Sequence, residues 1–216
     1  SDLVRVDHDT YALAYYGYNQ PSSQQWGGWI KTFTVNGGTI TEVAALRHFT
    51  SQTYDHSFIK VDADTYALAF SDNSQDGNIR TFTIPADGSS ITQAGTLEHD
   101  TDNGGYNSFV QVDSDTYALA YAGTGEDGFI STFTISADGS TITEVASLEH
   151  DTGTAWYNSL VQVDSDTYAL AYTGTDFDGF IKTFTISADG STITEVASLE
   201  HDTDQGSYDS LVQVDS

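Results

Sequence analysis

The sequence predicts an all-β protein built of repeated four-stranded antiparallel units, and three observations support this prediction. A string that begins Val-Asp and continues Asp-Thr-Tyr-Ala recurs along the 216 residues. Its copies start at Val6, Val61, Val112 and Val163, with a stub at Val214, so the starts are 55, 51, 51 and 51 residues apart. β-branched and aromatic residues fill segments with a period of two. Gly, Asp and Ser separate these segments, as they do at turns.

The elements of one unit are clearest in its last complete copy. The expected strands cover residues 159–163, 168–172, 180–186 and 193–199. Alternation along the second strand points Tyr and Leu to one side and two Ala to the other. A large and a small apolar face are expected where a sheet packs on both sides and one neighbour comes close. Short links join the four strands, and the turn at 188–191 is a tight hairpin, so each unit is an antiparallel meander.

Three short links and one longer connection per unit are the pattern of a β-propeller blade. In such a blade the first strand is innermost and the fourth outermost. Units of about 50 residues are too small to bury separate cores, which argues against a chain of independent sandwiches. We therefore expect one β-propeller or propeller fragment over residues 1–216. Its repeats are 1–56, 57–107, 108–158 and 159–209, and 210–216 begins a fifth.

The strings within residues 166–186, Asp-Thr-Tyr-Ala-Leu-Ala-Tyr and Asp-Gly-Phe-Ile-Lys-Thr-Phe-Thr-Ile, resemble the repeats of secreted bacterial and archaeal β-propeller arrays of uncharacterised function. The resemblance covers essentially the whole chain. It implies the fold and supplies no catalytic residues. Because those arrays are secreted, we expect an extracellular or cell-surface protein.

The chain is strongly acidic, with a formal charge of −26 from 32 Asp and Glu against 6 Lys and Arg. This charge argues against nucleic acid and anionic membranes as partners. The absence of Cys excludes disulfides and cysteine nucleophiles. We expect no signal peptide and no membrane insertion, since no charged-then-apolar leader and no apolar run near 18 residues occurs. A start without Met and within a repeat suggests a mature or excised piece.

Functional residues are expected where the copies differ. Residues 112–162 and 163–213 differ at nine of 51 aligned positions, and eight of these lie in two kinds of link. One kind joins the second and third strands of a unit, and the other joins successive units. Both emerge at the same end of each blade, which we call the variable rim. Loops tolerate change, but the turns at the opposite end are unchanged, which favours a function for the variable rim.

Aromatic residues with polar neighbours gather on the variable rim. Aromatic faces stack on sugar rings, and carboxylates and amides bond sugar hydroxyls. We therefore predict a non-catalytic adhesion or binding module for a glycan or another surface ligand. The candidate residues are Trp26, Trp29, Tyr54, His56, Trp156, Tyr157, Phe177 and Tyr208. The alternative is that the rings fill gaps between blades, and it is favoured for the apparently recurring Tyr54, Tyr106, Tyr157 and Tyr208.

Two other functions remain open. The chain contains four units and the first strand of a fifth, and unpaired strands at its ends would pair with other copies. It would then be an assembly protein, a homo-oligomer that closes a ring or builds a surface multimer. A polysaccharide-active enzyme is conceivable because carboxylates abound. However, nothing selects two of the 32 acids, and no catalytic motif is present.

Calcium is the one cofactor that the sequence suggests, and we expect no other. Two Asp-x-Asp-x-Gly strings resemble the opening of a calcium loop, with Asp100, Asp102, Asp202 and Asp204 as the candidate ligands. The third copy lacks the second acid, and no Glu stands at the twelfth position. Solvated loop acids are the alternative.

Histidines recur in the string Leu-Glu-His-Asp. They are His99, His150 and His201, with His48 in the first unit. Histidine beside acids can bind zinc or transfer protons. Recurrence in every blade favours a structural role instead, such as a bond to the edge of the fourth strand.

Overall fold

The structure is a computed structural model that describes residues 1–19 and 25–212. These residues form sixteen β-strands and two short 3₁₀ turns, Thr124–Glu126 and Thr175–Phe177. The strands make four antiparallel sheets of four, each in chain order, so the predicted all-β meander is confirmed. No helix in the described part of the chain is long and apolar enough to cross a membrane.

The four sheets correspond to the four repeats. The first contains β1 (Asp2–Arg5), β2 (Thr10–Asn19), β3 (Gln25–Asn36) and β4 (Thr39–Phe49), and the second contains β5 (Thr53–Lys60), β6 (Thr65–Asp72), β7 (Gly77–Thr83) and β8 (Thr92–Asp100). The third contains β9 (Gly105–Gln111), β10 (Thr116–Ala122), β11 (Asp127–Ile135) and β12 (Ile142–Thr154). The fourth contains β13 (Trp156–Gln162), β14 (Thr167–Thr173), β15 (Gly179–Ile186) and β16 (Ile193–Asp202).

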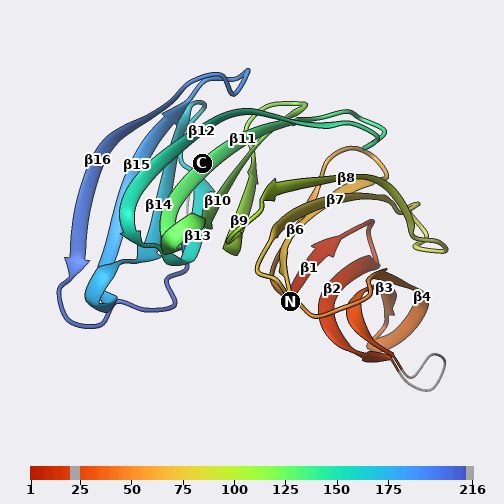
Figure 1. Cartoon of the computed structure of the whole chain (residues 1–216). Helices are drawn as coiled ribbons and strands as arrows, with labels where there is room; N and C mark the ends of the chain where they lie inside the picture. Colours follow the sequence, from red (N-terminus) through yellow and green to blue (C-terminus); the bar gives the residue numbers. More distant parts are fainter. Residues whose placement is uncertain (20–24, 213–216) are drawn as a thin grey trace.

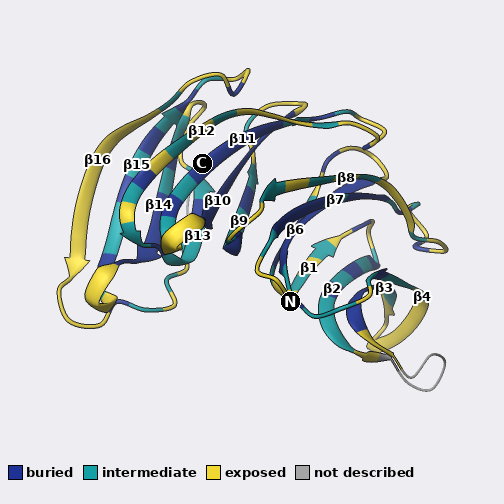
Figure 2. Cartoon of the chain, viewed as in Figure 1, coloured by how far each residue is buried: buried dark blue, intermediate teal, exposed yellow. Residues whose placement is uncertain are grey.

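The sheets follow one another around an arc, as the blades of a propeller do (Figure 1). Their first strands lie on the inside, where β1 contacts β5, β5 contacts β9, and β9 contacts β13. The fourth strands lie on the outside. Figure 2 shows β16 exposed along its length, whereas β6 and β10 are buried. The strand order within each blade is therefore the predicted one.

A separate apolar core fills the space between each pair of successive sheets. In the first core, the small side chains of Ala12 and Ala14 pack in one cluster with Tyr66 and Leu68 of the next sheet, and all four are fully buried. The other two cores repeat this pattern with the equivalent residues. The large and the small face predicted from alternation are thus the two halves of one contact between blades.

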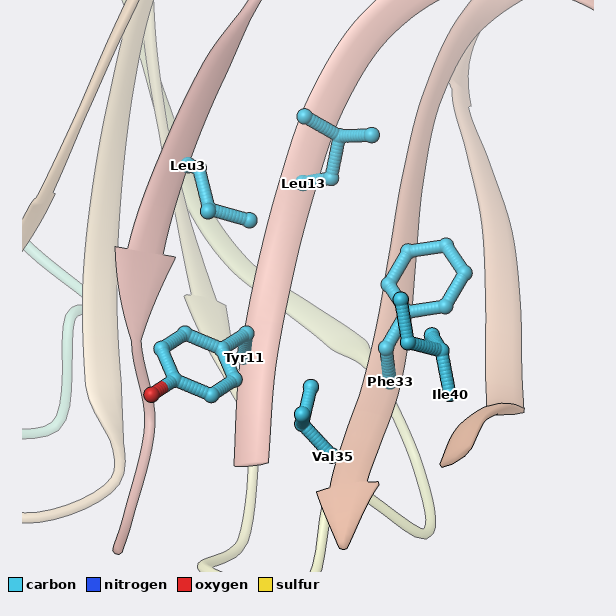
Figure 3. Close-up of a pocket in the computed structure, with 6 residues that line it drawn as sticks. All are labelled: Leu3, Tyr11, Leu13, Phe33, Val35 and Ile40. Carbon is cyan, nitrogen blue, oxygen red and sulfur yellow. The ribbon is translucent and has the colours of Figure 1, made fainter. Parts of the chain in front are cut away.

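Three cores for four sheets leave two faces uncovered in the described residues. One is the large face of the first sheet, which Figure 3 shows. Leu3 on this face is 56% exposed, whereas its equivalents Phe58, Phe109 and Leu160 are 3%, 7% and 5% exposed. The other is the small face of the fourth sheet.

A buried threonine ties each blade to the hairpin turn of the next. The hydroxyls of Thr32, Thr81 and Thr132 donate to the carbonyls of Gly88, Gly139 and Gly190 at 2.7, 2.6 and 2.7 Å. These glycines have φ of 66°, 71° and 71°, a left-handed conformation that glycine adopts without strain. The Asp-Gly turns therefore dock one blade on another as well as reverse the chain.

Replacing Thr132 by Val should lower the free energy of unfolding by about 1–3 kcal/mol. The change leaves the Gly190 carbonyl without its donor, and it removes the acceptor of the Ala146 N–H, which lies 3.2 Å from the hydroxyl. Thr183 holds the same position in the fourth sheet, where the described residues offer its hydroxyl no such turn. Thr183→Val should therefore change stability by less than about 0.5 kcal/mol. Urea unfolding of both variants checks this, and equal losses would contradict it.

The inner strands begin earlier than the repeat pattern indicated. We expected the strand of the second unit to start at Ser57, but β5 starts at Thr53, and its pairing with β6 shifts register between Tyr54 and Ser57. In the fourth unit the shift lies between Trp156 and Ser159. A β-bulge inserts an extra residue at such a point. The period of the sequence does not reveal it.

Candidate functional site

The two kinds of loop on the variable rim are hydrogen-bonded to one another. In three blades, a carbonyl in the link between the second and third strands accepts from a backbone N–H in the connection to the next blade. The pairs are Gln75 with Gly104, Glu126 with Ala155, and Phe177 with Gly206, at 2.9, 3.0 and 2.9 Å. These hydrogen bonds thus hold the loops of the variable rim together.

Backbone strain is concentrated on the variable rim. In the described residues, eight residues other than glycine have left-handed φ values between 50° and 76°, and all eight lie there: Asp55, Gln75, Tyr106, Glu126, Tyr157, Asp176, Phe177 and Tyr208. Such a conformation costs about 1–3 kcal/mol per residue and is found preferentially at binding and active sites. The strain holds these side chains in positions that a regular strand would not offer.

Aromatic rings on the variable rim form two groups. The first aromatic cluster joins Tyr16 to Trp26 and Tyr54, and Trp26 to Tyr18, with ring centroids 5.4, 6.2 and 5.3 Å apart. The second aromatic cluster consists of Tyr106, Trp156, Tyr157, Phe177 and Tyr208, with neighbouring centroids 4.2 to 5.9 Å apart. Together the clusters present ring faces and edges from all four blades.

A polar cleft of about 310 Å³ is lined by one member of each cluster, Tyr54 and Tyr106. Its remaining lining residues are Asp55, Ser71, Gln75, Asn103, Gly105 and Glu126. Four of the eight strained residues are among these. The cleft therefore combines aromatic walls with carboxylates, amides and a hydroxyl.

The electrostatics of the polar cleft favour hydrogen bonding to a neutral ligand. It is lined by two acids, Asp55 and Glu126, and by no Lys or Arg. Burial, followed by the charges of these two acids, raises the pKa of Tyr106, so its hydroxyl keeps its proton and can donate. Gln75 and Asn103 can donate and accept.

A second hollow of about 210 Å³ adjoins the polar cleft and shares Asp55 and Tyr106 with it. It is also lined by Ser1, His56, Asn107, Tyr157 and Asn158. The side-chain oxygens of Asn107 and Asn158 are buried without a hydrogen-bond partner in the described residues. Both can accept a hydrogen bond from a ligand hydroxyl, so the hollow extends the polar cleft.

Two candidate residues are not displayed as the sequence suggested. Trp29 is only 5% exposed, because it lies on β3 opposite Tyr15 in the position that Phe129 and Phe180 hold in later blades. We expected Trp29 among the aromatic residues displayed on the variable rim, and its burial in a strand shows that this was wrong. His56 is 9% exposed, and its Nε2 lies 2.9 Å from the Thr53 hydroxyl, so only its edge reaches the hollow.

The other candidates do lie in the two aromatic clusters, but one was assigned to the wrong repeat position. Tyr54 pairs with Ser71, as Trp156 pairs with Thr173, so these two rings are equivalent. In the second blade, Asp55 occupies the repeat position that Tyr106 occupies in the third. A repeated tyrosine is thus replaced by an acid at the centre of the polar cleft.

Sequence reasoning did not identify most residues of the polar cleft. Asp55, Ser71, Gln75, Asn103 and Glu126 come from two blades and from both kinds of link. Asp55 stands where the later repeats have Tyr, and this difference could have identified it as a site residue. The bulge obscured the alignment of the repeats at this point. The other four look like ordinary loop residues.

The acids proposed for calcium act in turns. The N–H groups of Asp102 and Asn103 donate to Asp100, and those of Asp204 and Gln205 donate to Asp202, at 2.9 to 3.2 Å. Asp151, in the copy without a second acid, accepts from Gly153 in the same way at 3.0 Å. In the described residues no group of three or more His, Cys, Asp or Glu could hold a metal ion. Calcium therefore remains a prediction from the sequence.

His48, His99 and His150 lie between blades, whereas His201, in the fourth sheet, is exposed. His99 and His150 meet Tyr121 and Tyr172 of the next blade edge to face, with centroids 4.7 and 5.1 Å apart. Each also packs against the glycine of the Asp-Gly pair that precedes or begins the third strand of its own blade, His99 against Gly77 and His150 against Gly128. We call this pair the His–Gly contact. Burial lowers the pKa of both rings to about 3, so they are neutral. This supports the structural role, but their nitrogens have no partner in the described residues, and the expected bond is not made.

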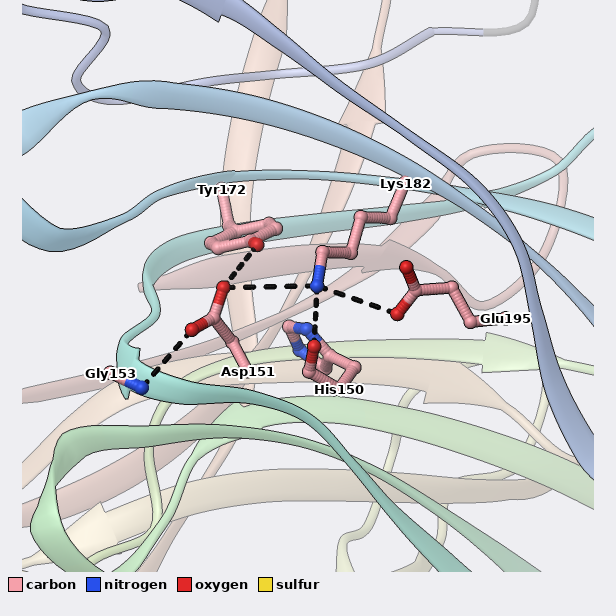
Figure 4. Close-up of polar contacts among 6 residues, drawn as sticks. All are labelled: His150, Asp151, Gly153, Tyr172, Lys182 and Glu195. Atoms are coloured by element: carbon pink, nitrogen blue, oxygen red, sulfur yellow. Dashed lines mark hydrogen bonds and ion pairs between the residues drawn. The ribbon is translucent and has the colours of Figure 1, made fainter.

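A polar network joins the third and fourth blades (Figure 4). The Tyr172 hydroxyl donates to Asp151 at 2.6 Å, and Lys182 Nζ lies 3.8 Å from Asp151 and 3.4 Å from Glu195. Lys182 also donates to the His150 carbonyl. The contacts of Asp151 with Tyr172 and Lys182, and of the His150 carbonyl with Lys182, join the two blades, so we interpret the network as a structural bridge.

No family model and no curated protein matches the chain. Many solved structures are similar, among them the following three. A putative 6-phosphogluconolactonase from Bacteroides fragilis aligns with a TM-score of 0.61 at 15% identity, over 89% of this chain and 54% of that one. Sqt1 from Saccharomyces cerevisiae aligns with 0.56 at 10% identity, over 88% and 45%, and a hypothetical selenium-binding protein from Sulfolobus tokodaii with 0.62 at 8%, over 97% and 60%.

These likenesses concern the fold. At such identities they support a β-propeller-like architecture and nothing about activity. The chain spans about half the length of the structures that it matches.

Proposed function

We propose that this protein is a non-catalytic extracellular binding module whose variable rim holds a neutral glycan. The observation that carries the proposal is the polar cleft, lined by Tyr54 from one aromatic cluster and Tyr106 from the other. A sugar ring needs an apolar surface for its C–H groups and hydrogen-bonding groups for its hydroxyls. The polar cleft brings both together at the size of a small ligand site.

The charge of the site supports a neutral ligand over an anionic one. The polar cleft is lined by two acids and no base, and the whole chain carries −26. Carboxylated, sulfated or phosphorylated sugars would be repelled. A phosphosugar lactonase activity, which the name of one similar structure suggests, is less well supported for the same reason.

Replacing Trp156 by Ala should weaken glycan binding at least tenfold, which corresponds to about 1.4 kcal/mol. Trp156 packs against Tyr106 at 5.9 Å and extends the aromatic surface beside the polar cleft. Tyr54→Ala should have a similar effect from the opposite wall. Isothermal titration with soluble neutral polysaccharides measures the loss, with pectin and heparin as anionic comparisons.

Val145→Ala is the control, because Val145 lies exposed on the outer strand β12. It should bind as the parent does, and thermal unfolding should show that all variants are folded. Stronger binding of the anionic polymers, or unchanged binding by both aromatic variants, would contradict the proposal. Release of reducing ends on long incubation would identify a polysaccharide-active enzyme instead.

A role in assembly is favoured by a separate observation, the two uncovered sheet faces. It does not compete with glycan binding, because those faces lie away from the variable rim.

A further inference from the structure

The two uncovered faces are the complementary halves of the contact that joins successive blades. The large face of the first sheet carries Leu3, Tyr11, Leu13, Phe33, Val35 and Ile40 (Figure 3). The small face of the fourth sheet carries Val161, Val163, Ala169, Ala171, Ile181 and Leu199. The equivalents of both sets pack against each other in all three cores.

Several residues on both faces are exposed, whereas their equivalents between two described blades are buried. Val163 is 52% exposed, whereas its equivalents Val6 and Val61 are 4% and 8% exposed. Ile40 and Leu199 are 71% and 62% exposed. Contiguous apolar surface of this kind marks interaction sites, and each face already has the shape of the other's partner.

The equivalents of the polar groups that bridge the third and fourth blades recur on these faces without a partner from another blade in the described residues. Tyr15 and Lys31 of the first sheet hold the positions of Tyr172 and Lys182. His201 and Asp202 of the fourth sheet hold those of His150 and Asp151. Lys31 already binds Glu42 at 2.8 Å, as Lys182 binds Glu195. In the described residues, Tyr15 and Lys31 lack only the contacts that Tyr172 and Lys182 make to the preceding blade.

A further polar contact can be completed in the same way. The hydroxyls of Tyr66 and Tyr117 donate to the carbonyls of Val6 and Val61 in the preceding blade, at 3.4 and 3.1 Å. Tyr11 and the Val163 carbonyl are the equivalent donor and acceptor. The two faces therefore match in apolar shape, in charge and in hydrogen bonding.

We propose that the large face of the first sheet binds the small face of the fourth sheet of a second copy of this chain. Two such contacts would join two copies head to tail into one closed ring of eight sheets. A heterologous contact closes a ring when its rotation allows, and here the contact continues the one that already curves each chain. The solved structures that it resembles are about twice as long as this chain, so two copies together have about the length of one of them.

One segment of the chain competes with this contact. The Leu211 N–H donates to the Ser159 hydroxyl at 2.9 Å, as the Leu160 N–H donates to Ser108 in the preceding junction. Residues 210–212 therefore occupy the place that β1 of a second copy would take. Since β1 is already paired in its own sheet, we infer that it displaces this short segment on binding.

One contact of the internal junctions will not be reproduced. The hairpin of the first sheet turns at Gly37 and Gly38 and is two residues shorter than the turns that carry Gly88 and Gly139. Thr183 will thus gain no carbonyl partner from a second copy. The copy-to-copy contact should be weaker than the contact between blades of one chain.

Sedimentation velocity of the full chain over a range of concentrations tests the proposal. We expect a monomer–dimer equilibrium that shifts to the dimer at high salt, which screens the repulsion between two chains of charge −26. Leu199→Asp should weaken the dimer at least tenfold, because it places a charge in the apolar contact. Val196→Asp is the comparison on the same strand and should weaken the dimer much less, because its equivalents Val43 and Val145 stay 38% exposed where a neighbouring blade is present.

Two further variants probe the polar pairing and the competing segment. Asp202→Asn should weaken the dimer several-fold, and deletion of residues 210–216 should strengthen it. A strict monomer for both the parent and the deletion variant would overturn the proposal. Equal effects of Leu199→Asp and Val196→Asp would also overturn it. Assembly that grows beyond the dimer would overturn ring closure. Neither result depends on glycan binding, since the assay contains no ligand.

Discussion

A fall from about pH 7.5 to about pH 5.5 should remove at least about 4 kcal/mol from the free energy of unfolding. Burial lowers the pKa of His56, His99 and His150 to about 3, and it lowers that of His48 well below its usual value. An unfolded chain has ordinary histidines with a pKa near about 6.5, so it takes up protons first as the pH falls.

The sign of the effect follows from these lowered pKa values. Stability is complete above about pH 6.5 and is lost progressively as the pH falls toward the folded pKa. Each of the three histidines with a pKa of about 3 contributes about 1.4 kcal/mol at about pH 5.5. Asp138 and Asp189 have pKa values of about 2 because serine and backbone donors bond them. These two aspartates therefore affect the free energy of unfolding only at more acidic pH.

Urea unfolding at the two pH values measures the loss. His99→Leu should reduce the loss between the two pH values by about 1.4 kcal/mol, since it removes one of the buried rings. His8→Gln is the matched control, because His8 is exposed, and it should leave the pH dependence unchanged. Equal stability at the two pH values would contradict the prediction, and so would equal effects of the two variants.

Replacing Gly128 by Ala should lower the free energy of unfolding by about 3 kcal/mol. A Cβ there would stand 2.5 Å from Cε1 of His150 and 2.8 Å from the Ala155 Cβ. The His150 ring is held by Tyr172 and Phe184, with centroids 5.1 and 5.7 Å away, so it has little room to move. This is the His–Gly contact of the third blade.

Gly105→Ala is the control for this substitution. Its nearest neighbour would be the flexible Asp55 carboxylate at 3.1 Å, so the loss should stay below about 1 kcal/mol. Combining Gly128→Ala with His150→Ala should cost less than the sum of the two single losses by more than about 1 kcal/mol, because the smaller side chain makes room. Strict additivity in urea unfolding would show that the two residues do not interact.

The recurring Leu-Glu-His-Asp and Asp-Gly strings illustrate what repetition alone can reveal. Recurrence in every blade correctly favoured a structural role for the histidines. It did not reveal that each histidine and each link glycine meet in space. Residues far apart in one repeat touch because the fourth strand runs beside the third, which is a property of the sheet.

The variable rim was located from the sequence, and its binding surface was not. Differences between copies pointed to the end of the blades where the polar cleft lies, and Trp156, Tyr157, Phe177 and Tyr208 form one aromatic cluster there. The polar cleft was missed because its residues come from two blades. A left-handed bulge also puts Asp55, and not Tyr54, in the position of Tyr106.

The sequence by itself determined the strands, their order and the presence of a large and a small apolar face on each sheet. Those features depend on the period of the repeat and on the alternation of side chains, which are local properties of the chain. Only the tertiary structure decided that Trp29 is buried, that the polar cleft exists and that two complementary faces remain uncovered. These depend on which surfaces of different blades meet and on how many blades are present, and one repeat contains neither kind of information.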